Sequence, residues 1–88
     1  MAELLTQIIN VQIESFGAIR RQLPEDLSLQ STVGTTVENV LDDVKRAYSE
    51  ASDLLERCAC AIGEDIISRN TILKDDAVIV LLSPVAGG

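Results

Sequence analysis

The residues of this chain best suited to chemistry are its last two, both glycines, because they would present a free α-carboxylate without any side chain around it. The last five residues come after an apolar run at 77–82 and Ser83; they are Pro84, Val85, Ala86, Gly87 and Gly88. Pro84 lacks an N–H group and is expected to end the strand. Five extended residues reach about 16 Å. We therefore expect residues 1–83 to form a domain and residues 84–88 a thin tail that carries the carboxylate of Gly88 into a narrow channel of another protein.

A simpler interpretation of the tail stays open. Glycines are common at chain ends, where fraying costs little free energy, and a small adaptor could carry them by accident. The position of the two glycines, in a short segment that follows a strand and begins with a proline, favours a functional tail.

Other reactive side chains are scarce. Histidine is absent, so the commonest general base and the commonest metal ligand are missing, together with every Ser-His or Cys-His pair. The only thiols are Cys58 and Cys60. In a strand at 57–62 they would point to one face, and we interpret them as buried or half-buried strand residues, with no metal site.

Composition narrows the function classes further. A chain of 88 residues with 47% hydrophobic residues is one small domain with a real core. Its net charge of −7 and its two aromatic residues argue against nucleic-acid binding, and the acidity suits a basic partner surface. No signal peptide or membrane span is visible, so a cytoplasmic location is predicted.

The patterns predict an α+β fold with a mixed sheet of four to five strands packed on one main helix. Residues 8–15 alternate as a half-buried strand that pairs with 27–31 as a hairpin. An apolar stripe predicts a helix over 37–48, capped by Thr35 in a capping box with Glu38, or by the competing Thr36. Leu54 and Leu55 suggest a further helical turn. Strands are then expected at 57–62, 66–67 and 77–82.

The last strand is apolar on both of its faces, although one helix can cover only one of them. Because successive strand residues point to opposite faces, Phe16 and Leu82 are expected on the uncovered face. An exposed apolar patch of this kind usually marks a docking surface. The alternative is that the segment 1–7 or a crossing loop covers it.

These features together resemble the ubiquitin-like β-grasp sulfur carriers, and among them the small subunits of molybdopterin synthase. Residues 16–20 (Phe-Gly-Ala-Ile-Arg) are similar to the family's motif at the end of the first strand, and residues 33–37 (Val-Gly-Thr-Thr-Val) to its Gly-x-Thr-Val segment before the helix. Residues 73–88 resemble the closing motif Leu-x-Asp-Gly-Asp-x-Val…Pro-Pro-Val-x-Gly-Gly. Asp76-Ala77 replaces Gly-Asp in that motif, Ser83 replaces its first proline, and Ile62-Gly63 stands near the family's frequent Val-Asn.

The resemblance implies a β-grasp fold and a cycle at Gly88. An E1-like adenylyltransferase would join AMP to the carboxylate with ATP and Mg²⁺, and this chain would bind no cofactor itself. A cysteine desulfurase or rhodanese-like donor would then supply sulfur for a thiocarboxylate. The large subunit of molybdopterin synthase, assembled with this chain as a cytoplasmic heterotetramer, would pass the sulfur to cyclic pyranopterin monophosphate. Partner contacts carried over from the family fall on Phe16, Ile66 and Leu82, and catalytic side chains are expected on the large subunit.

Two rival functions keep the same fold. One is a sulfur carrier for another acceptor, such as tRNA, thiamine or another thio-metabolite. The other is a protein modifier that joins Gly88 to lysines of target proteins.

Overall fold

The computed structural model describes residues 7–84, and its architecture is the predicted α+β fold. In this part of the chain, five strands, two α-helices and two short 3₁₀ helices follow one another. They are β1 (Ile8–Phe16), η1 (Gly17–Arg21), β2 (Ser28–Thr32), α1 (Val37–Ala47), η2 (Ser49–Ala51), α2 (Ser52–Arg57), β3 (Ala59–Ile62), β4 (Asp65–Ile67) and β5 (Ala77–Leu82).

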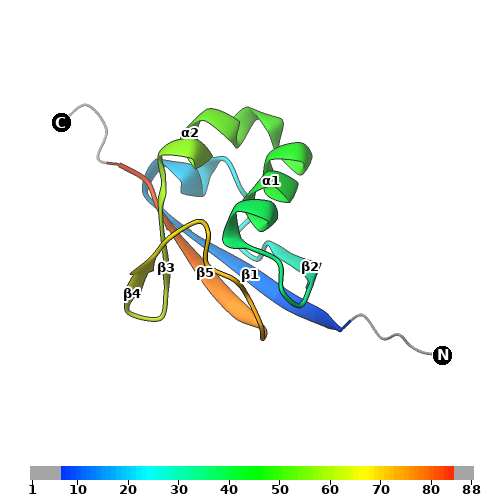
Figure 1. Cartoon of the computed structure of the whole chain (residues 1–88). Coiled ribbons are helices and arrows are strands. Elements are labelled where there is room, and N and C mark those ends of the chain that lie inside the picture. The colour runs from blue at the N-terminus through cyan, green and yellow to red at the C-terminus, as the bar shows by residue number, and fades with distance from the viewer. Residues whose placement is uncertain (1–6, 85–88) are drawn as a thin grey trace.

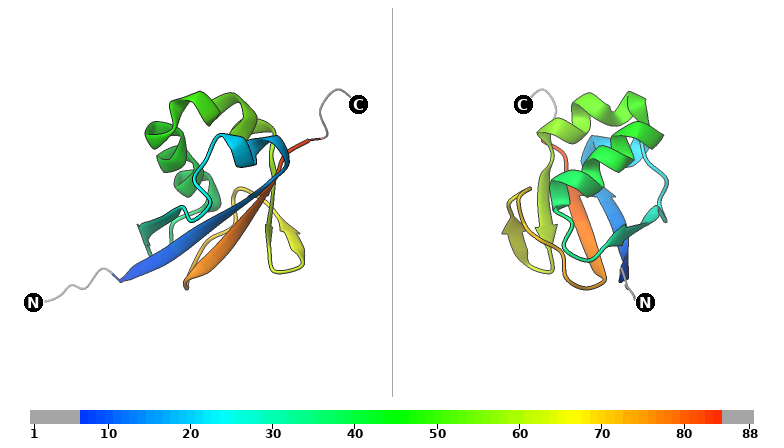
Figure 2. Two further views of the ribbon diagram at one scale, coloured as in Figure 1. Left: turned by 180° about the vertical axis from the view of Figure 1, so that it is seen from behind. Right: turned by 45° about the vertical axis from the view of Figure 1, so that its right-hand side comes forward.

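The strands form one mixed sheet in the order β2-β1-β5-β3-β4. The first and last strands, β1 and β5, lie side by side and parallel at its centre, while every other pair is antiparallel. Figure 1 shows this central pair crossing below the helices. Both α-helices cover the same face of the sheet (Figure 2), so within residues 7–84 the opposite face carries no α-helix.

The core lies between α1 and the covered face of the sheet. The apolar stripe of α1 is fully buried, as predicted, at Val37, Val40, Leu41 and Val44. Alternate residues of the two central strands meet this stripe from below. They are Ile9, Val11 and Ile13 of β1 and Ile79 and Leu81 of β5, each at most 4% exposed.

The cap of α1 differs from the favoured prediction. The hydroxyl of Thr36, rather than that of Thr35, accepts the hydrogen bond from the backbone N–H of Asn39 at 3.1 Å. Thr35 instead exchanges backbone hydrogen bonds: its carbonyl accepts from the N–H of Leu73, and its own N–H donates to Thr32. The competing cap was therefore the correct one.

The predicted strand at 57–62 begins two residues too early. Arg57 ends α2, and β3 starts only at Ala59. The guanidinium group of Arg69 donates to the carbonyl oxygens of Leu55 (2.6 Å) and Cys58 (3.0 Å), which satisfies acceptors at the end of this short helix. The helix therefore runs up to the strand with a single residue between them.

Most of the predicted tail lies outside the described residues, as does the segment 1–6. Of the tail, the structure places only Pro84, which is exposed. Within residues 7–84, no helix is long and apolar enough to cross a membrane.

Candidate functional site

An apolar patch occupies the uncovered face of the sheet at the end where β1 and β5 finish. Phe16 is directly opposite Leu82 in the parallel pair, and Leu82 is opposite Ala59 of β3. Neighbours in register point to the same face of a sheet. Half of the surface of Phe16 is exposed, so this row presents a large ring to solvent.

The third predicted contact residue, Ile66, belongs to the next row of the same patch. Ala61 of β3 is opposite Val80 on one side and Ile66 on the other. Ile66 is 68% exposed, the largest exposed fraction among the big apolar residues described. The structure therefore brings Phe16, Ile66 and Leu82 together on one face, although they come from three different strands.

The patch is separate from the core. Ala61 is only 7% exposed, yet it does not belong to the core cluster beneath α1, which fits its place on the opposite face of the sheet. Val78, further along β5 on this face, is 37% exposed. We call the set Phe16, Ala59, Ala61, Ile66, Val80 and Leu82 the docking face.

The tail leaves the domain at the edge of the docking face. Hydrogen bonds that the sequence did not predict hold the chain at this point. The hydroxyl of Ser83 donates to the carbonyl oxygen of Phe16 at 2.8 Å and accepts from the N–H of Ile19 at 2.8 Å. The N–H of Ser83 also donates to the Phe16 carbonyl, at 3.1 Å. The last residue before Pro84 is thus tied to the turn that follows β1.

Gly17 makes this close approach possible. Its φ of +84° is in the left-handed region, and a Cβ atom at this position would lie 3.1 Å from both Cβ and Oγ of Ser83. Any other residue here would combine backbone strain with an unusually tight contact to Ser83. The sequence contained one signal, the serine in place of the family's proline, but its partners lie more than 60 residues away.

The two thiols lie in the hydrophobic core. Cys60 lies on β3 and Cys58 just before it, and both are buried, free and part of the core cluster. Burial raises the pKa of both thiols above the ordinary value, and the neighbouring Ser83 side chain partly opposes this at Cys58. Raised values disfavour the reactive thiolate.

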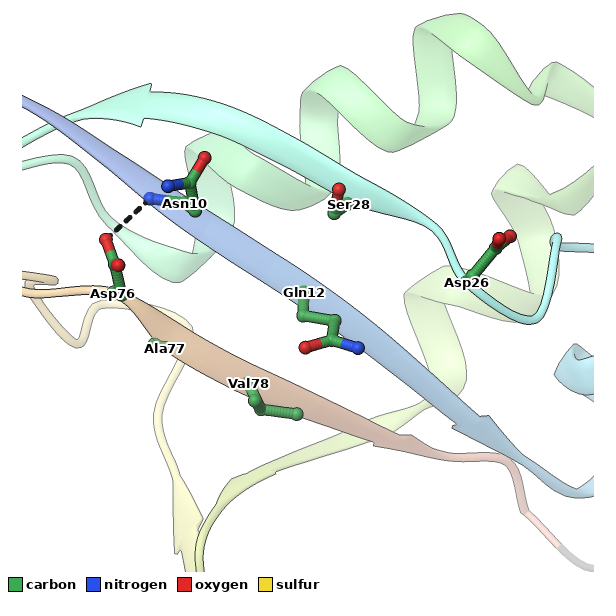
Figure 3. Close-up of a pocket in the computed structure, with 7 residues that line it drawn as sticks. All are labelled: Asn10, Gln12, Asp26, Ser28, Asp76, Ala77 and Val78. Atoms are coloured by element: carbon green, nitrogen blue, oxygen red, sulfur yellow. Dashed lines mark hydrogen bonds between the residues drawn. The ribbon is translucent and has the colours of Figure 1, made fainter.

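A polar pocket lies on the same face at the far end of β1 and β5 (Figure 3). Gln12 and Val78 line this pocket and are opposite each other in the β1–β5 pair. They come four residues before the pair Phe16–Leu82, so the pocket lies about 13 Å along the strands from that pair. Here the carboxylate of Asp76 accepts a hydrogen bond from the N–H of Asn10 at 2.8 Å, which ties the turn before β5 to β1. Asp76, one of the departures from the family motif, therefore has a local structural role.

Among residues 7–84, no group of acidic, cysteine or histidine side chains is arranged to hold a metal ion. Among the described residues, an exposed apolar surface has the chain exit at its corner, an arrangement that suits docking and presentation of the tail. The predicted reacting group at Gly88 and the tail residues Val85, Ala86 and Gly87 lie outside the described residues.

Comparison with known proteins finds relatives that match nearly the whole chain. The chain is 29% identical over 85 residues to the molybdopterin synthase sulfur carrier subunit of Mycobacterium tuberculosis, a match that covers 92% of this chain and all of that protein. It also matches a chain in the protein–protein complex of subunits 1 and 2 of the molybdopterin-converting factor of Helicobacter pylori. That match has 30% identity and a TM-score of 0.64 and covers 91% of this chain and 100% of the other.

The fold is shared more widely. SAMP1 of Haloferax volcanii, a small archaeal modifier protein, superposes with a TM-score of 0.77 at 14% identity, covering 90% of this chain and 99% of its own. The predicted ubiquitin-like β-grasp fold is thereby confirmed. Residues 13–88 match the ThiS family, a stretch that includes the docking face, Ser83 and the tail. The chain therefore belongs to the ThiS family.

Proposed function

We propose that this chain is the sulfur carrier of a molybdopterin synthase and acts through the α-carboxyl group of Gly88. The observation that carries the proposal is the position of the tail exit. Ser83 and Pro84 follow directly on Leu82, a member of the docking face. A protein that binds this face meets the start of the tail at the same corner. The match to the M. tuberculosis sulfur carrier along its whole length supports the same function.

Activation must come first in this proposal. A carboxylate with a pKa of about 3.5 is ionised at neutral pH and is a poor electrophile. An E1-like adenylyltransferase joins the carboxylate oxygen to the α-phosphorus of ATP, with Mg²⁺, and releases pyrophosphate. The resulting acyl adenylate has AMP as a good leaving group.

Sulfur then replaces AMP. A persulfide on a cysteine desulfurase or rhodanese-like donor attacks the carbonyl carbon with its terminal sulfur, and AMP leaves. A second thiol of the donor reduces the sulfur–sulfur bond, which frees the thiocarboxylate and leaves a disulfide on the donor. Cys58 and Cys60 take no part, since both are buried and both thiol pKa values are raised.

The large subunit is the partner that uses this sulfur. By analogy with the H. pylori complex of two subunits, it binds the docking face and receives the tail in its active site. There the sulfur of the thiocarboxylate displaces an oxygen leaving group from a carbon of cyclic pyranopterin monophosphate and forms a thioester. Water then hydrolyses the acyl–sulfur bond, which leaves the sulfur on the pterin and returns the Gly88 carboxylate. Each thiocarboxylate delivers one sulfur, so a dithiolene needs two rounds.

Reconstitution tests the proposal. The chain, carrying a Gly88 thiocarboxylate, is mixed with the large subunit and cyclic pyranopterin monophosphate, and molybdopterin is measured as its fluorescent oxidation product. We expect product in proportion to thiocarboxylate, and none from a chain that lacks Gly87 and Gly88. No product from an intact, bound complex would overturn the proposal.

The same thiocarboxylated chain distinguishes the rival functions. Sulfur incorporated into tRNA or a thiazole precursor, without molybdopterin, would assign the carrier to another pathway. Gly-Gly remnants on lysines of other proteins would indicate a protein modifier.

A further inference from the structure

We propose that Ser83 and Gly17 form a lock that fixes how the chain leaves the sheet at Pro84, which makes Ser83 a positioning residue for the reaction at Gly88. The inference rests on the proposed function for its catalytic part, while the lock itself is a feature of the fold.

The lock consists of three hydrogen bonds at one corner of the sheet. Two converge on the carbonyl oxygen of Phe16, from the hydroxyl and the N–H of Ser83, and the third runs from the N–H of Ile19 to the same hydroxyl. The hydroxyl therefore bridges the end of β1 and the first turn of η1, both as donor and as acceptor. The pairing of β5 with β1 does not depend on these side-chain bonds, because the ladder between the two strands already ends at the pair Phe16–Leu82.

Two backbone features restrict the same point. Gly17 lets Ser83 approach closely, since a Cβ there would lie 3.1 Å from the serine side chain. Pro84, directly after Ser83, disfavours the helical region for the serine backbone and keeps it extended. The hydrogen bonds of the Ser83 side chain thus hold the chain at residue 83, and the rigid ring of Pro84 restricts it at the next residue.

The lock joins the docking face to the tail. Phe16 supplies its ring to the docking face and its carbonyl oxygen to Ser83, so a partner bound to the ring holds the start of the tail in fixed geometry. Holding a reacting group in place removes an entropic cost from the reaction, and small misplacements can lower a rate about 100-fold. Without the lock, the same tail would start from a variable point.

Ser83 is not required for the core. It lies outside the buried core cluster and is only partly buried. Ser83→Ala removes the two bonds of the hydroxyl and keeps the backbone N–H bond to Phe16. We therefore expect this variant to fold and to bind the large subunit with unchanged affinity.

The test separates binding from turnover. In single-turnover sulfur transfer from preformed thiocarboxylate, Ser83→Ala should lower the maximal rate about 10-fold or more, with Kd for the large subunit within a factor of about two of wild type. Ser28→Ala, at an exposed serine on β2, is the matched control and should change neither value. In Ser83→Ala, amide hydrogen exchange at Ile19 should become faster, because the N–H of Ile19 loses its acceptor, the Ser83 hydroxyl.

Gly17→Ala tests the lock from the other side. It should lower the rate as Ser83→Ala does, and the two effects should not add in the double variant, because both disrupt one contact. Gly34→Ala is the control for backbone strain, since Gly34 has a φ of +95° but no atom within 4 Å of the added Cβ. It should leave the rate of sulfur transfer unchanged.

The outcomes separate the two proposals. A wild-type rate in Ser83→Ala, in a system where the native chain transfers sulfur, would overturn the positioning role. Unchanged exchange at Ile19 would overturn the lock. A native chain that binds its partner and transfers no sulfur would instead overturn the proposed function.

Discussion

Phe16 and Leu82 lie opposite each other in the parallel β1–β5 pair, on the face of the sheet that the helices leave uncovered. One residue ends the first strand and the other ends the last, and Pro84 follows only two residues after Leu82. The exposed ring of Phe16 and the exit of the tail therefore occupy one corner of the docking face. This relationship underlies the proposal that binding and delivery are performed by the same region.

Replacing Phe16 with Asp should weaken the complex with the large subunit. A carboxylate within an apolar contact must lose its hydration on binding, and truncation of a buried aromatic anchor costs about 2 kcal/mol or more, which is about 30-fold in Kd. Isothermal titration calorimetry measures the change. The thermal midpoint should stay close to that of the native chain, since Phe16 is half exposed.

Ile8→Asp is the matched control. Ile8 lies on the same strand, has the same parity as Phe16 and is 56% exposed, but it stands at the opposite end of β1. Its substitution should leave the affinity intact. Equal losses from both variants would contradict a docking face that includes Phe16 and excludes the opposite end of β1.

Gly88→Val should fold normally and fail to be adenylated. The variant adds a branched side chain next to the carboxylate, where the proposed channel accommodates only hydrogen, and we expect adenylation to fall at least about 100-fold. ATP–pyrophosphate exchange with the adenylyltransferase reports the step. Adenylation at the native rate would remove the argument that the tail threads a narrow channel.

The sequence predicted the parts of the fold that depend on local periodicity. Alternation along β1 identified both its buried row and the outward position of Phe16, and the helical stripe identified α1. The apolar character of β5 on both faces predicted a patch that Val80 and Leu82 help to form. These signals are strong because each is repeated over several residues of one element.

Features that depend on contacts distant in sequence could not be predicted in this way. Arg69 stabilises the end of α2 from 11 or more residues away, which displaced the expected start of β3. Ser83 was noted only as a departure from a proline, and its bonds to Phe16 and Ile19 require the parallel pairing of the first and last strands. Ile66 was carried over from the family resemblance, and its place on the docking face depends on the register of β4.

Cys58 and Cys60 should resist modification in the folded protein. Both are buried and have thiol pKa values raised by burial, so little thiolate forms between pH 7 and the ordinary thiol value of about 8.5. Ellman's reagent should detect almost no thiol in the native chain and both thiols in guanidinium chloride. Rapid reaction of either thiol in the native state at pH 7.5 would contradict their placement in the core.

Leu41→Ala should destabilise the domain more than any substitution on the docking face. Leu41 is fully buried on α1, and truncation of such a residue costs about 2 to 5 kcal/mol. Urea unfolding measures the free energy, with Leu54→Ala at a partly buried position as a milder control. Similar losses in both variants would contradict the central position of Leu41.

The central claim is that the α-carboxyl group of Gly88 carries sulfur, and the intact mass of the chain tests it most directly. The chain is isolated from cells that contain or lack the adenylyltransferase, and fragmentation locates any change. We predict the mass increase of one oxygen replaced by sulfur, confined to Gly88 and present only with the adenylyltransferase. An unmodified Gly88 in both preparations, although the chain is folded and bound to its partner, would contradict the account.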